Sequence, residues 1–187
     1  MDTLKKLGPF EDWDKPSWNE CFMGMAYLIA MMSPDPNTKN GAVIVDKFKH
    51  VKAMGFNGFP PDCVDDDMPK CRPDKYDFIE HAEKNALNNR TVDVAGMTMY
   101  VTGYPCKSCF LTIRCNRIST VIYDPNNQAK CVNEDDMRII EKLNSRYVSE
   151  TNAIIDDGKI IELIPFEGDS SICMKRAMEY YKIKQEN

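Results

Sequence analysis

Two short segments of the sequence contain the residue types that bind a transition metal and move protons. The first is His81-Ala82-Glu83, and the second is the pair Cys106 and Cys109, separated by two residues. Each segment follows a strand or loop and lies at the start of a predicted helix. Two cysteines with this spacing at a helix start can direct both sulfur atoms at one ion, and the imidazole of His81 can supply a third ligand. The pattern therefore predicts a metal site.

The donor set indicates a catalytic zinc ion. Zinc prefers four ligands, so three protein ligands leave one position for water, as in catalytic sites. Helix N-termini favour negative charge and lower the pKa of thiols, which promotes the thiolate form that binds metal. Two thiolates balance the charge of the ion, so Glu83 is free to carry protons between water and a substrate. Because zinc lowers the pKa of its water to about 7, hydrolytic chemistry at neutral pH is expected.

A structural zinc knuckle, or no metal at all, is the alternative interpretation of a Cys-x-x-Cys pair. Pro105 before the pair, the His-x-Glu segment and the two helix starts favour the catalytic interpretation. The sequence contains only two histidines, His50 and His81. A Cys2His2 site would need His50, which lies in a predicted hairpin turn where a solvated side chain is expected.

The predicted fold is α/β, with three α/β/α layers around a mixed five-stranded sheet, because strands alternate with helices along the chain. The first two strands form an antiparallel hairpin at one edge. Ser17 is the predicted N-cap of the first helix, and the prolines of the SPDPN segment end that helix. The predicted helices cover residues 17–32, 81–89, 106–117, 134–143 and 170–181. The predicted strands cover residues 41–45, 51–56, 97–102, 119–123 and 159–165.

The chain is expected to form an N-terminal arm, residues 1–16, and a single domain, residues 17–187. That domain has a core at 17–125 and a C-terminal extension at 126–187. No apolar run approaches the roughly 18 residues that a membrane span needs, and the start lacks a secretory signal pattern. We expect a cytoplasmic protein whose cysteines are thiols or metal ligands instead of disulfides.

The net charge is −5, from 24 basic and 29 acidic residues, and no basic cluster is present. Proteins that bind duplex DNA or tRNA carry a clustered positive face, because neutralising phosphates supplies much of their affinity. A small phosphorylated ligand needs only a few local donors. The charge balance therefore favours a mononucleotide partner over nucleic acid, and no membrane partner is expected.

Further segments extend the pattern beyond the metal ligands. They are DPNTKNGAVIV (35–45), GFNGFP (55–60), DCVDDDMP (62–69), EHAEKNAL (80–87) and GMTMYVTGYPCKSC (96–109). Together they resemble the deoxycytidylate (dCMP) deaminases, phage and viral type, of the cytidine deaminase-like zinc deaminase superfamily. The resemblance covers residues 27–125, and His-x-Glu followed by Pro-Cys-x-x-Cys is the signature of zinc nucleobase deaminases.

The resemblance implies a cytidine deaminase-like fold and the zinc-dependent hydrolysis of dCMP to dUMP and ammonia, which supplies dUMP for dTMP synthesis. It makes His81, Cys106 and Cys109 the zinc ligands and Glu83 the proton shuttle. Another interpretation is a tRNA adenosine deaminase, although the negative charge disfavours it. Deamination of cytidine or free cytosine is a third interpretation, and a non-catalytic, zinc-stabilised interaction module is a fourth.

The resemblance also implies contacts with the substrate. Asn57 lies near the base or sugar, although an Asn-Gly turn with a left-handed Asn57 is an equal alternative. The backbone N–H of Ala82 is the expected donor to the pyrimidine O2. Tyr104 and Tyr123 wall the base pocket or belong to the core. The candidate ligands of a 5′-phosphate are the basic residues Lys39, Arg72, Lys75, Arg90 and Arg114.

Larger members of the family are hexamers that dCTP activates and dTTP inhibits, so the resemblance implies a homo-oligomer with a regulatory site. The expected allosteric residues are Asn40, Gly55, Gly58, Asp65 and Asp66. The acidic run at 65–67 could hold Mg²⁺ that bridges triphosphate oxygens, or it forms a solvated loop tip. Asn40 and Lys84 depart from the valine and leucine usual in the family. Cys63 and Cys71 leave a second, structural zinc site open.

Overall fold

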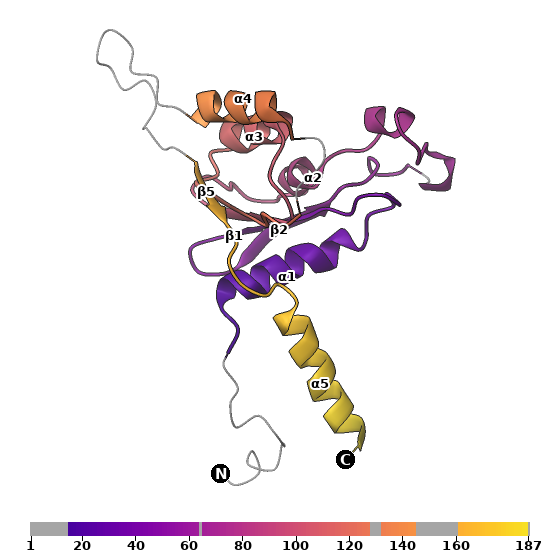
Figure 1. Cartoon of the computed structure of the whole chain (residues 1–187), viewed down its shortest axis with the longest axis vertical. Coiled ribbons are helices and arrows are strands. Elements are labelled where there is room, and N and C mark those ends of the chain that lie inside the picture. The colour runs from indigo at the N-terminus through magenta and orange to yellow at the C-terminus, as the bar shows by residue number, and fades with distance from the viewer. Residues whose placement is uncertain (1–14, 64, 128–131, 145–160, 187) are drawn as a thin grey trace, which may run out of the picture.

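A mixed sheet of five strands forms the middle layer of the structure (Figure 1). The computed structural model describes residues 15–63, 65–127, 132–144 and 161–186. The strands are β1 (Gly41–Val45), β2 (Val51–Phe56), β3 (Thr98–Val101), β4 (Thr120–Tyr123) and β5 (Glu162–Pro165). Their order is β2-β1-β3-β4-β5, with β1 antiparallel to β2 and β3, and with β3, β4 and β5 parallel. The predicted mixed sheet with a hairpin at one edge is confirmed.

Helices lie on both faces of this sheet, which confirms the three predicted layers (Figure 1). The helices are α1 (Trp18–Ala30), α2 (Ala82–Asn88), α3 (Lys107–Cys115), α4 (Glu134–Asn144) and α5 (Ile172–Glu186). Helices α2, α3 and α4 lie on one side, whereas α1 covers the other side and α5 leads away from α1. Among the described residues, no helix has the length and apolar character of a membrane span.

Two hydrophobic cores, one on each side of the sheet, hold the layers together. Strand β1 is buried along its whole length, and its side chains alternate between the two cores. Ile44 packs with Leu87 and Phe110 in the core between the sheet and helices α2 and α3. Val43 packs with Phe22 in the core between the sheet and α1. A strand buried on both faces needs apolar residues at every position, which explains the uninterrupted GAVIV run.

Helix α1 begins where the sequence predicts. The Ser17 side chain accepts a hydrogen bond from the Glu20 N–H (3.2 Å), and the Glu20 carboxylate accepts one from the Ser17 N–H (2.8 Å). This reciprocal capping box satisfies main-chain donors at the helix start. The helix ends at Ala30, earlier than the predicted Met32. After Ala30 the chain tightens into 3₁₀-type hydrogen bonds, from the Met32 N–H to the Ile29 carbonyl and from the Ser33 N–H to the Ala30 carbonyl (both 3.0 Å).

The loop predicted at 57–76 contains two short 3₁₀ turns, η3 (Asp65–Asp67) and η4 (Asp74–Asp77). The predicted turn at 156–158 lies outside the described residues, as does most of the N-terminal arm. Helix α5 begins close to its predicted start and continues to Glu186.

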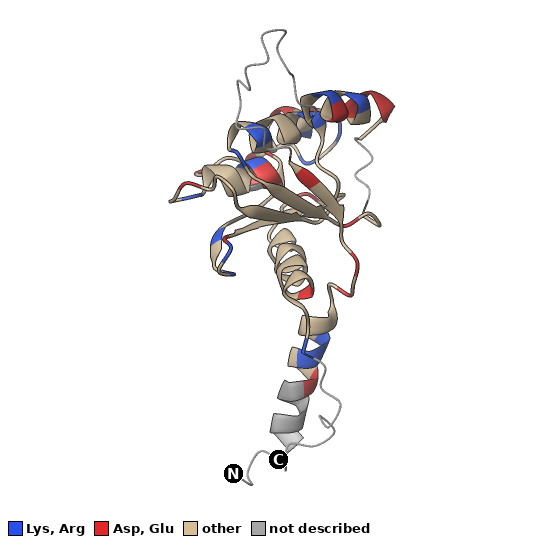
Figure 2. Ribbon diagram, turned by 90° about the vertical axis from the view of Figure 1, so that its left-hand side faces the viewer, with Lys and Arg blue, Asp and Glu red and all other residues tan. Residues whose placement is uncertain are grey.

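Helix α4 carries charges of both signs along its length (Figure 2). Its first turn holds Glu134, Asp135 and Asp136 and its last turn holds Lys142, an order that complements the helix dipole. The Asp136 side chain is buried, and its Oδ1 lies 2.9 Å from Nζ of Lys107 in α3. This ion pair joins α4 to the N-terminal turn of α3.

Two glycines in neighbouring strands let helices approach the sheet closely. A Cβ atom on Gly55 would lie 2.3 Å from the Ala86 nitrogen of α2, and one on Gly41 would lie 2.0 Å from the Ala26 oxygen of α1. Both distances are far below van der Waals contact, so only glycine permits the observed packing. Gly55 thereby sets the position of α2 on β2.

Replacing Gly55 with alanine should destabilise the protein, because the added methyl group would overlap the main chain of α2. We expect the melting temperature to fall by about 2–12 °C, which corresponds to about 1–3 kcal/mol of overpacking in a chain of this size. Differential scanning fluorimetry measures this, with Met54→Ala as a matched control at the exposed neighbour of Gly55. An unchanged melting temperature for Gly55→Ala would contradict the close approach.

Candidate active site

His81 and Cys106 occupy equivalent places in two neighbouring helices. Each is the N-cap of its helix, with extended backbone, and neither side chain caps its own helix. Both side chains are therefore available to a ligand next to the main-chain N–H groups of the first turns. The predicted helix starts are one residue too early, because His81 and Cys106 precede α2 and α3. Cys109 lies two residues inside α3 and is buried.

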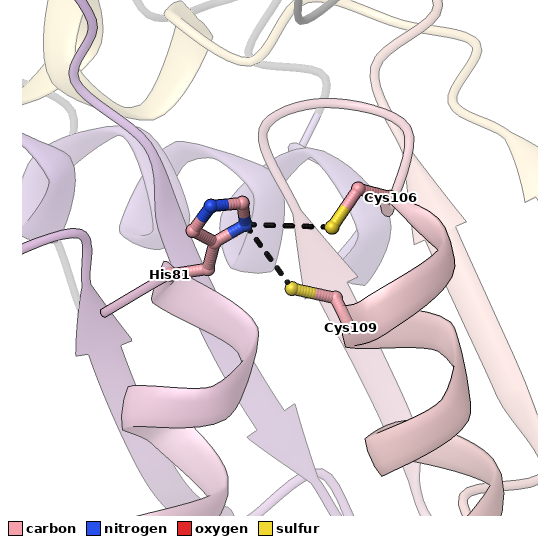
Figure 3. A group of neighbouring side chains, drawn as sticks. All are labelled: His81, Cys106 and Cys109. Carbon is pink, nitrogen blue, oxygen red and sulfur yellow. Dashed lines mark hydrogen bonds between the residues drawn. The ribbon is translucent and has the colours of Figure 1, made fainter. Parts of the chain in front are cut away.

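The three donor atoms converge between α2 and α3 (Figure 3). Nδ1 of His81 lies 3.5 Å from Sγ of Cys106 and 3.3 Å from Sγ of Cys109. A tetrahedral zinc site with Zn–N about 2.0–2.1 Å and Zn–S about 2.3 Å places its nitrogen and sulfur ligands about 3.5 Å apart. The arrangement thus fits a zinc ion with one position left for water. Within the described ranges, this is the group of three or more His, Cys, Asp or Glu side chains whose ligand atoms all lie within 4.8 Å of one another.

The ionisation of the three side chains is linked. Hydrogen bonds with Cys109 and His81 lower the pKa of the Cys106 thiol to about 4, although burial opposes this change. The same hydrogen bond with Cys106, together with burial, raises the pKa of Cys109. The hydrogen bond with Cys106 also raises the pKa of His81. The cluster therefore stabilises negative charge at one point, where a divalent cation would allow the second sulfur to ionise.

Glu83 lies in the first turn of α2 and lines the same pocket as His81 and Cys106. The residue is only 6% exposed, and this burial raises the pKa of its carboxyl group, with the nearby His81 acting in the opposite direction. A carboxyl group whose pKa is moved toward neutrality can both accept and return a proton at working pH. The burial of Glu83 and its raised pKa are the properties expected of a group that transfers protons.

A cavity of about 140 Å³ opens next to these residues. Its size is suited to a single six-membered ring, since a cavity of about 150 Å³ binds benzene. The lining residues near the metal ligands are His81, Ala82, Glu83, Tyr104 and Cys106. A second set of polar and aromatic side chains lines the rest of the cavity: Asp35, Thr38, Asn40, Asn57, Arg72, Lys75 and Tyr76.

Asn57 lines the cavity and connects two chain segments. Its Oδ1 accepts a hydrogen bond from the Asn40 N–H (2.7 Å), and its Nδ2 donates to the Thr38 carbonyl (2.8 Å). The alternative of a left-handed Asn57 in an Asn-Gly turn is wrong, because this residue does not have a positive φ angle. These two hydrogen bonds fix the chain that leads into β1, on the side where Asn57 lines the cavity.

The structure separates the roles of the two candidate tyrosines. Tyr104 lines the cavity, and the ring of Tyr123 packs against it edge-on, with centroids 4.9 Å apart at 86°. Tyr123 does not line the cavity and supports Tyr104 from the side of the core. Ala82 is buried at the first position of α2, where the main-chain N–H has no acceptor within the helix.

Only some of the basic residues proposed as phosphate ligands lie at the cavity. Arg72 and Lys75 line it. Lys39 instead contacts the Ser33 carbonyl, Arg90 contacts the Leu87 carbonyl at the end of α2, and Arg114 lies in the last turn of α3. Of the five basic residues considered as phosphate ligands, Arg72 and Lys75 are therefore the two that line the cavity.

The expected allosteric residues fall in different environments. Asn40 lines the cavity itself. Gly55 is buried against α2, and packing accounts for a glycine there. Gly58 exchanges main-chain hydrogen bonds with Glu80 (3.1 and 2.9 Å), which fixes the residue before His81. Asp66 is exposed in η3 and pairs with Lys70 at 3.0 Å, and Asp65 begins the same turn.

Asp35 and Asn85 are two polar residues at the site that sequence reasoning missed. Asp35 is buried beside the cavity, although sequence reasoning assigned its side chain no role of its own. Asn85 donates a hydrogen bond from Nδ2 to the Phe56 carbonyl (2.8 Å) and so fastens α2 to β2. Its spacing of four residues from His81 places both on one side of the helix, which was the available signal.

Comparison with known proteins decides the family. The sequence profile of the cytidine and deoxycytidylate deaminase zinc-binding region matches residues 16–124, more than half of the chain. The protein belongs to this family. Its zinc-binding region contains His81, Cys106 and Cys109, which converge in the structure.

Curated relatives of this cytidine and deoxycytidylate deaminase family member include enzymes from animals and phages. The deoxycytidylate deaminase of Homo sapiens is 39% identical over 117 residues, which cover 59% of this chain and 66% of the human protein. The chain thus spans just under two thirds of that relative. The deoxycytidylate deaminase of Mycobacterium phage D29 is 33% identical over 123 residues, covering 58% of this chain and 95% of the phage protein.

Solved structures share the fold of this family member. The dCMP deaminase of cyanophage S-TIM5 has a TM-score of 0.59 and 24% identity, covering 82% of this chain and all of that chain. The Rib2 deaminase of Aspergillus oryzae has a TM-score of 0.51 and 13% identity, covering 90% of this chain and all of that chain. The predicted cytidine deaminase-like fold is confirmed.

Replacing Cys109 with serine should weaken zinc binding, because the substitution removes one of the three converging donors. We expect the affinity to fall by more than about 100-fold, since even outer partners of metal ligands account for 10- to 100-fold. Competition with a chromophoric chelator measures this affinity. Cys115→Ser, at an exposed cysteine of the same helix, is the control and should bind zinc as the wild type does. Equal affinities for the two variants would contradict the assignment.

Glu83→Gln should stabilise the chelator-treated protein at neutral pH. The raised pKa means that the folded state favours the neutral carboxyl group, so this stabilisation is full below the unfolded pKa and is lost as pH rises through the folded value. Glutamine stays neutral at every pH. We expect the variant to melt higher than the wild type at pH 8 and the difference to vanish near pH 4.

Glu162→Gln, which makes the same substitution at an exposed position of β5, is the control for this measurement. A Glu83→Gln variant that melts lower than the wild type at pH 8 would contradict the buried environment of this carboxylate.

Proposed function

We propose that the protein is a zinc-dependent enzyme that hydrolyses dCMP to dUMP and ammonia. The observation that carries this proposal is the convergence of His81, Cys106 and Cys109 beside a buried Glu83 in a ring-sized cavity. The named relatives support it, because the human and phage proteins are both deoxycytidylate deaminases.

The chemistry requires water to replace the amino group at C4 of the pyrimidine. His81, Cys106 and Cys109 would hold a zinc ion, which would make a water molecule in the pocket more acidic. Glu83 accepts a proton from that water and delivers it to N3 of the ring while the C4–O bond forms. Glu83 then passes the second proton of the water to the amino group. The C4–N bond breaks, ammonia leaves, and the ring keeps the oxygen as the carbonyl of dUMP.

The remaining pocket residues orient the nucleotide. The Ala82 N–H donates to O2 of the base, and Tyr104, supported by Tyr123, forms one wall of the base pocket. Asn57 contacts the base or sugar. The cations Arg72 and Lys75, which line the same cavity, support a substrate that carries a 5′-phosphate.

Regulation and assembly form a further part of the proposal. We propose a homo-oligomer, a hexamer as in larger family members, activated by dCTP and inhibited by dTTP in the cytoplasm. Exposed apolar side chains at the end of α1, Leu28, Met31 and Met32, support burial against another subunit. Asn40 and Gly58 are the expected contacts of the regulatory nucleotide, since changes there would reach the pocket. The exposed Asp66, with Asp65, is the expected place for Mg²⁺.

Ammonia release from dCMP, deoxycytidine, CMP and dCTP by the zinc-loaded protein tests the function. We expect dCMP to be the preferred substrate, with dCTP increasing and dTTP decreasing its turnover. Glu83→Gln should lower kcat by about 10²- to 10⁴-fold, the range for loss of a general acid–base residue, and should still bind zinc.

If the zinc-loaded protein released no ammonia from any of these pyrimidines, the assignment would be overturned. Turnover of a tRNA adenosine would favour the tRNA deaminase alternative. A Glu83→Gln variant as active as the wild type would exclude Glu83 as the proton carrier.

A further inference from the structure

We propose that Lys75 is a positioning residue for the nucleotide, and that its ion pair with Asp35 fixes the pocket wall that residues 35–40 and 72–79 form. A separate set of contacts fixes the metal ligands. This inference rests on the proposed function, because it concerns how the nucleotide is held.

Lys75 and Asp35 form a buried ion pair across the cavity wall. Nζ of Lys75 lies 2.6 Å from Oδ2 of Asp35, and the two side chains are 2% and 5% exposed. Lysine and aspartate are almost never buried to this degree unless they are paired. The pair joins the segment before His81 to the segment before β1.

The polar contacts continue from Asp35 to the other side of the pocket. Oδ1 of Asp35 accepts hydrogen bonds from the Asn37 and Thr38 N–H groups (2.8 and 3.3 Å). Asn57 then binds the main chain of Thr38 and Asn40, as described above. The carboxylate of Asp35 therefore orients the turn that presents Thr38 and Asn40 to the cavity.

On its own side, Lys75 is the centre of a small folded unit. Its N–H donates to the Cys71 carbonyl (3.0 Å), and its carbonyl accepts from the Ile79 N–H (3.0 Å). The Arg72 guanidinium and the Lys75 ammonium each lie 5.7 Å from the centroid of the Tyr76 ring. A displacement of Lys75 would therefore displace Arg72, Tyr76 and Ile79, which all line the cavity.

The metal ligands are fixed by other contacts. Gly58 and Glu80 exchange two main-chain hydrogen bonds immediately before His81, and Asn85 binds the Phe56 carbonyl. Both sets tie the ligand-bearing end of α2 to β2 without using Lys75 or Asp35. The two regions of the pocket should therefore respond independently to substitution.

Removing the ammonium would leave the Asp35 carboxylate buried without a compensating positive charge, which strongly destabilises the observed arrangement of the two segments. The segment around Lys75 would move so that water could reach the carboxylate. The nucleotide would then meet a widened pocket, whereas zinc and Glu83 would keep their places. Loss of binding with intact chemistry appears as a raised KM with little change in kcat.

The test compares zinc-loaded Lys75→Met, Lys75→Arg, the double variant Asp35→Asn/Lys75→Met and Asn85→Ala with the wild type. KM and kcat for dCMP, the melting temperature, and zinc affinity by chelator competition are measured for each. Calorimetric binding of dUMP provides a readout that does not depend on turnover.

For Lys75→Met we expect KM and the dUMP Kd to rise by about 10- to 100-fold, the effect of a displacement near 1 Å, with zinc affinity unchanged. Lys75→Arg should restore most of the binding. The double variant has no uncompensated buried charge, so it should recover the melting temperature. It still lacks the ionic link that holds the segment around Lys75 against the segment around Asp35, so its KM should stay high. Asn85→Ala, the matched control, should instead weaken zinc binding by about 10-fold or more.

Recovery of both stability and KM in the double variant would overturn the proposal and leave a purely structural pair. An unchanged KM in Lys75→Met, or a loss of zinc affinity equal to that of Asn85→Ala, would overturn it as well. A wild type that neither turns over dCMP nor binds dUMP would instead overturn the proposed function. That outcome is distinct from an active wild type with an unaffected Lys75→Met.

Discussion

The packing of α2 against β2 is the constraint on which the site depends. Because Gly55 has no side chain, the main chain of α2 lies directly on the strand, and Asn85 fixes the rotation of the helix through the Phe56 carbonyl. His81 then emerges at the helix start facing Cys106, the N-cap of neighbouring α3. The separations of 3.3 and 3.5 Å between nitrogen and sulfur follow from helix placement. The fold thus brings three donors, from the starts of two neighbouring helices, close enough together to hold one metal ion.

The pocket is lined by two kinds of buried ionisable group: the single carboxyl group of Glu83, and the paired side chains of Lys75 and Asp35. Burial raises the pKa of Glu83, and among the described residues no salt bridge to it is found. Lys75 and Asp35 instead form a buried ion pair, with Nζ and Oδ2 2.6 Å apart. Fixed polar groups in a dry site can stabilise developing charge without reorganising, which is an efficient way to lower a reaction barrier. The same groups reduce the stability of the folded chain, as the expected behaviour of Glu83→Gln illustrates.

Local patterns in the sequence predict the elements and the metal ligands but not the contacts between segments. The GAVIV run predicts a strand buried on both faces, and the two helix starts predict His81, Cys106 and Cys109 as a group. The pairing of Lys75 with Asp35 joins residues 40 positions apart, and no local period signals it. Tyr104 and Tyr123 likewise have similar sequence contexts, and only tertiary packing puts one at the cavity and the other behind it. The missed contacts are therefore those that packing alone determines.

A titration of dCMP turnover against added zinc tests whether the zinc ion proposed at His81, Cys106 and Cys109 is required for the reaction. The protein is first stripped of metal by a chelator, and the rate of ammonia release is then followed as zinc is restored. We expect no turnover in the stripped protein, a linear rise as zinc is added, and a plateau at one equivalent per chain. Turnover that does not depend on zinc, or a fully loaded protein that leaves dCMP unchanged, would contradict it.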